Sequence, residues 1–168
     1  MKTQQTNLKK SIEKIKSFDK RLSLLFNALP FPIGDELDIC LNMIQEKAKY
    51  GEHFAQIAYM CEKKNIKSLN VLINCASKAT EHPNQTKHVL RALFFNGFIN
   101  DGVNIWKKSV DHYSSHPSFT AQILACGLWF EETKAEAASR IQQFLKTPNG
   151  KEYEELTAVP AAADYNYL

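Results

Sequence analysis

The chain has 168 residues, of which 44% are hydrophobic and 23% are charged, and its formal net charge is +3. This length suffices for a single domain with its own apolar core, and the small net charge gives no indication of a nucleic-acid partner. The longest apolar runs, such as residues 123–130, are far shorter than the roughly 20 residues that span a bilayer. The first seven residues are polar, unlike a secretory signal. The composition therefore predicts a soluble, cytoplasmic protein.

An apolar stripe with helical spacing runs through the first thirty residues. Its members recur every three or four positions: Leu8, Ile12, Ile15, Phe18, Leu22, Leu25 and Leu29. The stripe predicts one amphipathic helix of about six turns within residues 1–30, ended by Pro30 and Pro32. Basic residues flank the stripe, and two interpretations stay open. It is either a capping helix with its lysines in water or a helix that lies on an anionic membrane or an acidic partner.

Residues 35–150 keep helical periodicity throughout and contain no run of alternating β-branched residues. The fold class is therefore predicted to be all-α, with about seven to eight helices in a single domain over residues 1–150. Residues 35–150 are expected to form helical hairpins, and residues 151–168 are expected to form a loosely ordered tail.

A faint internal repeat relates residues 69–95 to residues 103–129 at a shift of thirty-four positions. Asn70, His82, Pro83, Thr86 and Leu90 return as Asn104, His116, Pro117, Thr120 and Leu124. A helical hairpin cannot bury its apolar face alone, so stacked antiparallel hairpins are predicted, as a solenoid-like array or an irregular bundle. Each copy has His-Pro at its turn, where proline suits the first position of a helix.

The period of this repeat resembles that of tetratricopeptide repeats, which implies an array of stacked helical hairpins. The Trp-x-x-Leu-Gly pattern of that family is absent from both copies, and the proline lies between the helices of a pair instead of after them. The resemblance therefore assigns no functional residue.

No cofactor or metal is predicted. His112 and His116 have the spacing of two metal ligands on one helix face, but Pro117 places His116 at a turn. The six glycines are isolated, so there is no phosphate-binding loop. The four cysteines have no CxxC spacing and are expected to be reduced and buried. An enzyme remains an alternative, with a site assembled from distant helices around a cysteine and a histidine such as His53 or His88.

Aromatic residues gather in the middle of the chain, and most of them are expected in the core. In an array of hairpins some of them would line a concave groove that takes a partner helix or peptide. The candidates for this role are Phe94, Phe98, Trp106 and Trp129.

The tail contains two Tyr-x-x-Leu segments, at Tyr153 and Tyr165, which resemble the paired tyrosine motif read by tandem phosphotyrosine-binding domains. Glu152, Glu154 and Glu155, followed by small residues and a hydrophobic end, resemble the C-terminal translocation signal of bacterial type IVB secretion effectors. That resemblance implies delivery into a host cell.

The leading hypothesis is an α-helical protein–protein interaction module with a protein partner of unknown identity. The module is an adaptor, a chaperone or a translocated bacterial effector. The two alternatives are the enzyme described above and peripheral membrane association through the N-terminal helix.

Overall fold

The computed structural model describes residues 2–153, and these residues form helices and no strand. The nine helices are α1 (Lys2–Lys14), α2 (Phe18–Phe26), α3 (Asp35–Gln45), α4 (Gly51–Lys63), α5 (Leu69–Lys78), α6 (Pro83–Phe95), α7 (Ile99–His112), α8 (Pro117–Gly127) and α9 (Glu131–Leu145), followed by the 3-10 turn η1 (Lys151–Tyr153). The predicted all-α class is confirmed. The helix count is slightly higher than expected because the N-terminal stripe forms two helices.

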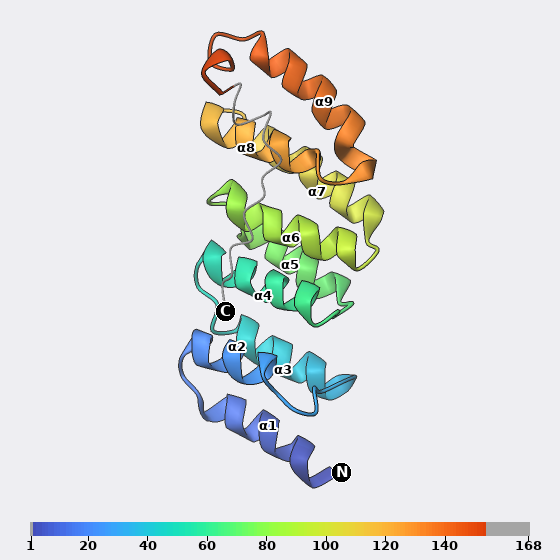
Figure 1. The fold of residues 1–168 in the computed structure, drawn as a ribbon. Coiled ribbons are helices and arrows are strands. Elements are labelled where there is room, and N and C mark those ends of the chain that lie inside the picture. The colour runs from blue at the N-terminus through green and yellow to red at the C-terminus, as the bar shows by residue number, and fades with distance from the viewer. Residues whose placement is uncertain (1, 154–168) are drawn as a thin grey trace.

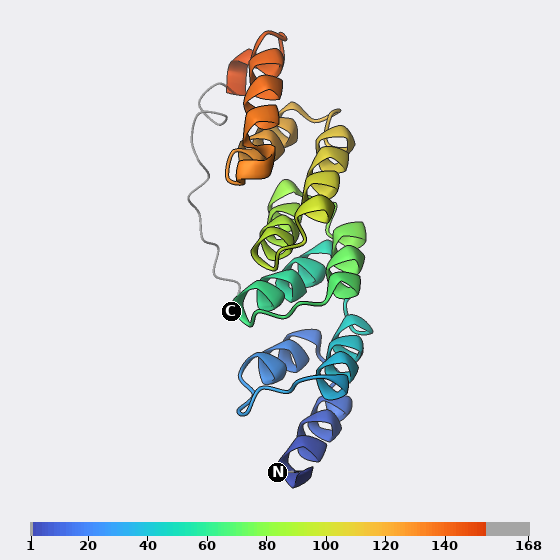
Figure 2. The same cartoon turned by 90° about the vertical axis from the view of Figure 1, so that its right-hand side faces the viewer.

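The helices stack in order along one axis, from α1 at one end to α9 at the other (Figure 1). Seen from the side, α1, α3, α5 and α7 form one column, and α2, α4, α6 and α8 form the other, with α9 beside α8 (Figure 2). The most extensive packing joins α4 to α6, the second helices of two successive hairpins. The hairpins are therefore stacked as an array.

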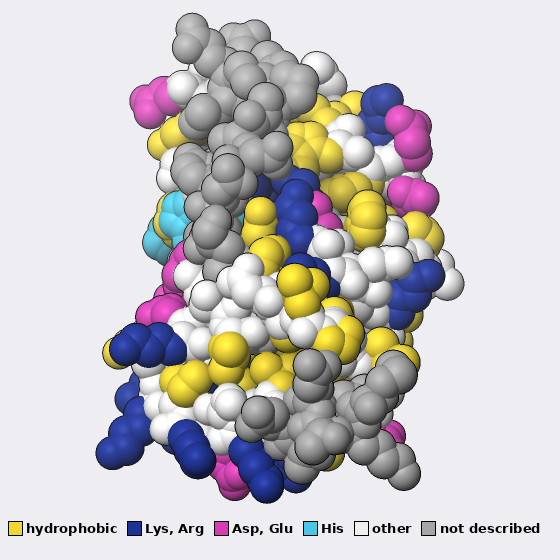
Figure 3. Space-filling view, turned by 60° about the horizontal axis from the view of Figure 1, so that its bottom comes forward, with side chains coloured by type: hydrophobic (Ala, Val, Ile, Leu, Met, Phe, Trp, Pro, Cys, Tyr) yellow, Lys and Arg dark blue, Asp and Glu magenta, His cyan; other side chains and the backbone are white. Residues whose placement is uncertain are grey.

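The apolar stripe of the first thirty residues is divided between α1 and α2, which corrects the prediction of one continuous helix. Ser17 starts α2, because its hydroxyl accepts a hydrogen bond from the Lys20 amide at 3.4 Å. Four members of the stripe are at most 5% exposed and belong to the core: Ile12, Phe18, Leu22 and Leu25. These members of the stripe thus face the neighbouring helices, whereas its last member, Leu29, is 94% exposed. Lys and Arg side chains gather along one edge of this end of the molecule (Figure 3).

One of the basic residues of this segment, Arg21, is buried and joins α1 to α3. Its side chain is 5% exposed, and its guanidinium donates to the carbonyl oxygens of Glu13, Ile15 and Met43. These carbonyls lie at or next to the C-terminal ends of α1 and α3, where the last turn of a helix leaves acceptors without intrahelical partners. Arg21 therefore satisfies acceptors at two helix ends and holds the first three helices together.

The interior consists of two apolar clusters that meet at α6. Buried residues of α1 to α6 form the first cluster, and buried residues of α6 to α9 form the second. Helix α6 contributes Val89, Ala92 and Leu93 to the first cluster and Leu90 to the second. A helix that is apolar on several sides lies in the interior, which explains the central place of α6.

The His-Pro pairs start α6 and α8, as the sequence predicts. Nδ1 of His82 accepts a hydrogen bond from the Asn84 amide at 3.1 Å, and so it caps the N-terminus of α6. Pro83 occupies the first helical position, where a backbone N–H is not needed. His116 and Pro117 start α8 at the equivalent place, but His116 makes no side-chain cap.

Candidate functional site

The four aromatic residues predicted to line a binding groove differ in how far they are buried, and one of them is inaccessible to a partner. Trp106 is fully buried in the second cluster, where its indole N–H donates to the Ile123 carbonyl at 2.9 Å. Trp106 cannot contact a partner without local unfolding, so the prediction that it binds a partner is not supported. Phe98 precedes α7 and packs against the first cluster. The ring of Phe94 stacks on that of Phe130, with 4.1 Å between their centroids.

The fourth aromatic candidate belongs to a group of side chains that crosses α4, α6 and the end of α8. We call this group the polar cluster. Its members are Tyr59, Glu62 and Lys63 of α4, Lys87, His88 and Arg91 of α6, and Trp129, which follows α8. Two contacts show that α4 and α6 share it: Nη2 of Arg91 donates to Oε1 of Glu62 at 2.8 Å, and the rings of Tyr59 and His88 meet edge to face at 5.9 Å.

Two lysines belong to the polar cluster, one on the side of α4 and one on the side of α8. The ammonium of Lys63 lies 3.9 Å from Oε1 of Glu62 and 5.2 Å from the ring centroid of Tyr59. The ammonium of Lys87 lies 5.3 Å from the ring centroid of Trp129. Both arrangements place a cation over an aromatic face, which attracts it through the ring quadrupole. The cluster therefore alternates cations and aromatic rings across three successive hairpins.

The polar cluster is charged and yet largely withdrawn from solvent. Glu62 is 7% exposed, Lys87 is 4% exposed and His88 is 1% exposed. Ionised groups are rarely buried to this extent unless they are paired, because burial removes their hydration. The second carboxylate oxygen of Glu62, Oε2, is buried and has no hydrogen-bond partner among the described residues.

Sequence reasoning missed most of this cluster, for a physical reason. Helix α6 looks like a core helix because of its apolar residues, so Lys87 and Arg91 were not considered as part of a site, and His88 was considered only as the base of an enzyme. The signal was present in the spacing: Lys87, His88 and Arg91 lie at positions i, i+1 and i+4, which one side of a helix presents together. Only the packing of α4 beside α6 brings Glu62 to that side.

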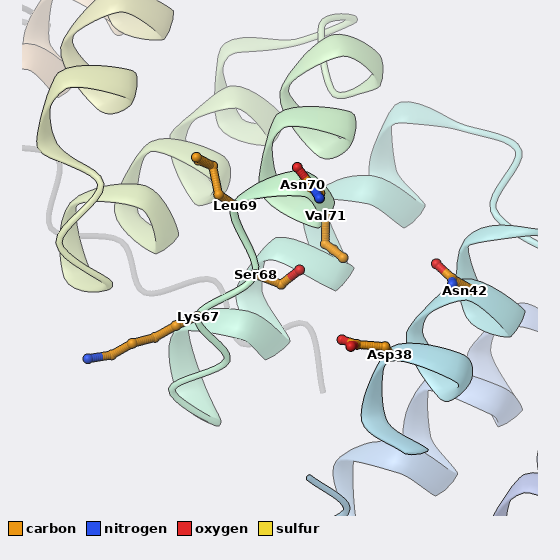
Figure 4. A pocket seen from close by; sticks show the side chains of 7 residues that line it. All are labelled: Asp38, Asn42, Lys67, Ser68, Leu69, Asn70 and Val71. Carbon is orange, nitrogen blue, oxygen red and sulfur yellow. The ribbon is translucent and has the colours of Figure 1, made fainter. Parts of the chain in front are cut away.

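Two hollows lie along the odd-numbered helices. The first, of about 530 Å³, lies between α3 and α5 and has a mostly polar lining. Asp38 and Asn42 face Ser68 and Val71 across it, and Lys67 points away (Figure 4). The carboxylate of Asp38 therefore lies near the start of α5, and the ammonium of Lys67 does not point toward it.

The second hollow, of about 440 Å³, lies between α5 and α7 and is more apolar. Ile73 and Ile105 line it, together with Lys108 and His112. Nε2 of His112 lies 3.0 Å from the carbonyl oxygen of Thr80, so this imidazole is held against the neighbouring hairpin. The hollow offers an apolar contact surface with one exposed lysine.

His112 and His116 do not share a site. His112 contacts the Thr80 carbonyl, whereas His116 lies at the start of α8. Residues 2–153 contain no group of three or more His, Cys, Asp or Glu side chains that could hold a metal ion.

The four cysteines are all buried, and burial governs their chemistry. Loss of hydration raises the pKa of Cys40 to about 11, raises those of Cys61 and Cys126 to about 12, and raises that of Cys75 well above its ordinary value. A thiolate nucleophile needs a lowered pKa and access to solvent. The ring of His53 stacks on that of Phe18, with 4.0 Å between their centroids, and its Nδ1 accepts a hydrogen bond from the Lys49 amide. Neither contact involves a cysteine. These surroundings give no support to the Cys–His alternative.

The tail motifs are described only at their beginning. Tyr153 is the last described residue, and its ring centroid lies 6.5 Å from that of Phe144. Tyr165, Glu154 and Glu155 lie outside the described residues. Within residues 2–153, no helix is both long enough and apolar enough to cross a membrane.

Comparison with known proteins finds no family model, no curated protein and no solved structure that matches this chain.

Proposed function

We propose that this protein is a helical-hairpin module that binds a polypeptide segment on the polar cluster. The supporting observation is a pair of contact sets that share helix α6: Lys63 and Arg91 with Glu62, and Lys87 with Trp129. The side chains of Lys63 and Arg91 are 40% and 24% exposed, so a partner can reach them. Stacked hairpins suit this role because each contributes side chains to one extended surface.

The chemistry of the polar cluster favours a peptide. Arginine, tryptophan and tyrosine are the residue types that dominate the binding energy of protein interfaces. Neighbouring helices lie about 10 Å apart, so the distance from α4 to α8 is about 20 Å. An extended chain covers that distance with about six residues.

The cellular role is an adaptor, a chaperone or a translocated effector, and the acidic tail with its hydrophobic end favours the effector. Membrane association is the weaker alternative. The central residues of the N-terminal stripe are buried in the first cluster, so the stripe cannot face a lipid surface while α1 and α2 are packed.

A pull-down with matched surface variants tests the proposal. The bait is the full chain, and the lysates come from the producing organism and from a eukaryotic host. Lys63→Glu reverses an exposed charge in the polar cluster, whereas Lys108→Glu makes the same change beside the apolar hollow of α5 and α7. We expect Lys63→Glu to reduce retention of the partner about tenfold, as loss of one favourable interface contact does, and Lys108→Glu to have little effect.

The opposite pattern, with loss of retention only in Lys108→Glu, would place the binding surface on α5 and α7 and contradict the proposal. Failure of the unaltered chain to retain any partner from either lysate would also count against it.

A further inference from the structure

The loop between α2 and α3 exposes two large aliphatic side chains, Leu29 and Ile33, which we call the knob. Leu29 is 94% exposed and Ile33 is 76% exposed, more than any other large hydrophobic residue among those that the structure describes. Exposed apolar side chains that occur singly are common on proteins, but two in one short loop form a patch. Such a patch favours contact with another surface.

The residues between the two members of the knob hold the loop in place. Pro32 is buried, and Phe31 is partly buried against the first apolar cluster. The centroid of the Phe31 ring also lies 5.6 Å from the ammonium of Lys64. The loop therefore packs on the array through Phe31 and Pro32 and presents Leu29 and Ile33 to solvent.

The apolar hollow between α5 and α7 has room for the knob. Ile73 of α5, which is 41% exposed, and Ile105 of α7 line this hollow. A cavity of about 150 Å³ holds a benzene molecule, whereas the hollow has about 440 Å³. The side chains of leucine and isoleucine are each smaller than benzene, so the hollow can take both members of the knob.

Carboxylates stand beside the knob. Asp35 and Glu36 begin α3, directly after Gly34. Residues 27–36 contain no lysine, arginine or histidine. Two residues of extended chain span about 7 Å at most, so the backbone keeps Asp35 within that distance of Ile33. Because Asp35 is exposed, a carboxylate accompanies the apolar patch.

A cation stands beside the apolar hollow. Lys108 is exposed and lines the hollow, at position i+3 from Ile105, so the two side chains are neighbours on α7. Within residues 2–153, Lys108 makes no ion pair, and Asp111 of the same helix lies 3.9 Å from Arg140 of α9. The hollow therefore combines an apolar lining with a charge opposite to that beside the knob.

We propose that the apolar hollow receives the knob of a second copy of this chain, with Asp35 facing Lys108. The charge complementarity favours a second copy, since an apolar contact alone would suit many partners. The knob cannot reach the hollow of its own chain, because its loop and α5 lie on opposite sides of α3 (Figure 2). The contact is heterologous, so each copy in a pair keeps one of its two surfaces open to a further copy.

A contact of this size is weak. Two aliphatic side chains and one ion pair bury much less than the roughly 1,000 Å² at which stable interfaces begin. An ion pair between exposed residues also adds little by itself. The chain is therefore expected to be monomeric when dilute and to associate when concentrated.

Sedimentation of the full chain over a range of concentrations tests the proposal. We expect the weight-average mass to rise at least about 1.5-fold between about 10 µM and about 1 mM, the range in which weak contacts become populated. The knob variant, Leu29→Ser with Ile33→Ser, and the hollow variant, Ile73→Glu, should each stay monomeric. All three positions are exposed, so both variants are expected to fold, and helical circular dichroism checks this.

The matched control is Phe95→Ser, which removes an exposed apolar side chain at the end of α6, outside the knob and the hollow. Its association should equal that of the unaltered chain. A mixture of the knob variant and the hollow variant provides a second measurement. Each variant retains the surface that the other lacks, so the mixture should form pairs and nothing larger.

Exchange of the two charges tests the ion pair. Lys108→Glu should lower the association constant at least about threefold, because a carboxylate then faces a carboxylate. Lys108→Glu combined with Asp35→Lys should restore the association. Asp35 is one of three acidic residues in the first turn of α3, so two carboxylates still favour that helix end in the double variant.

Four results would overturn the proposal. The first is a monomeric unaltered chain at about 1 mM. The second is association that both variants keep or that the Phe95→Ser control loses, and the third is a mixture that forms no pairs or a charge exchange that restores nothing. The fourth is a foreign protein that the unaltered chain retains and the hollow variant loses, which would assign the hollow to another occupant. None of these results decides the proposed function, because the knob and the hollow include no residue of the polar cluster.

Discussion

The hydroxyl groups of Thr86 and Tyr113 lie 2.8 Å apart in the interior and join two successive hairpins. Thr86 also donates its only hydroxyl proton to the Ala79 carbonyl at 2.9 Å, so Tyr113 must be the donor in the bond between the two hydroxyls. Thr120, thirty-four positions after Thr86, donates in the same way to the Tyr113 carbonyl at 2.9 Å. In both hairpins, a threonine of the second helix thus ties down the end of the first.

This chain of donors predicts unequal effects of two substitutions. Tyr113→Phe removes one donor and leaves Thr86 bonded to Ala79, so we expect a loss of about 1 kcal/mol in the free energy of unfolding. Thr86→Val leaves both the Ala79 carbonyl and the Tyr113 hydroxyl buried without this partner, so we expect a loss of about 2–4 kcal/mol. Urea unfolding measures both values. Equal losses would contradict the assigned direction of the bond.

Because α8 lies close to Trp106 at Gly127, we expect a larger residue at position 127 to strain the packing. A Cβ at Gly127 would lie 2.5 Å from the Trp106 ring, and the ring cannot withdraw freely because its N–H is bonded to the Ile123 carbonyl. We expect Gly127→Ala to destabilise the protein by about 1–3 kcal/mol in thermal or urea unfolding, as overpacking of a core does.

Gly102→Ala is the matched comparison. A Cβ there would lie 2.9 Å from the ring of Phe94, which is only partly buried and has no hydrogen bond to hold it, unlike the ring of Trp106. Gly102 lies inside α7, where alanine gains up to about 1 kcal/mol in helix propensity, whereas Gly127 is the last residue of α8 and gains less. Gly102→Ala should therefore be the milder change. A larger loss for Gly102→Ala than for Gly127→Ala would contradict the tight packing around Trp106.

The hydrogen bonds that His82 and His53 accept lead us to expect a loss of stability on acidification. Burial lowers the pKa of His82 below 6.5, and burial, opposed by Asp19, also lowers the pKa of His53. Both rings use Nδ1 to accept a backbone N–H, from Asn84 and Lys49 respectively, and protonation of Nδ1 would break those bonds. Their contribution is complete above the unfolded pKa of 6.5 and is lost as the pH falls through the lower folded pKa. Urea midpoints at neutral pH and at about pH 5 measure the loss.

His82→Asn provides the control for this pH dependence. Asparagine is a good N-cap residue and does not titrate, so the variant should keep its stability at neutral pH and lose less stability on acidification. An unchanged pH dependence in His82→Asn would show that the cap is not the group responsible.

The features that the sequence predicted well are those set by local chemistry. The His-Pro pairs start helices because proline fixes its own φ, and the spacing of apolar residues marks each helix whatever lies beside it. The break between α1 and α2 was missed because Ser17 interrupts the helix without disturbing the apolar spacing that runs from Ile15 to Phe18.

The candidate site depends on contacts between helices, which local patterns do not contain. The sequence shows Arg21 only as one of several basic residues beside the apolar stripe, and the approach of α1 and α3 supplies the carbonyls that bury it. Trp106 was assigned to a surface because aromatic residues serve both as core and as binding groups. Glu62 and Arg91 are 29 positions apart, so their pairing follows from the stacking of α4 on α6 and from no motif.

The buried cysteines give a prediction that bears directly on the enzyme alternative. At mildly alkaline pH, a thiol with a pKa of about 12, such as that of Cys61 or Cys126, is ionised at least about a thousandfold less than an exposed thiol. We expect none of the four cysteines to react with a disulfide reagent in the folded protein, and all four to react in denaturant. A Ser115→Cys variant, with its thiol at an exposed turn, should add one fast-reacting group and so control for reagent access. Rapid reaction of any native cysteine would contradict its burial and restore the hypothesis of a cysteine nucleophile.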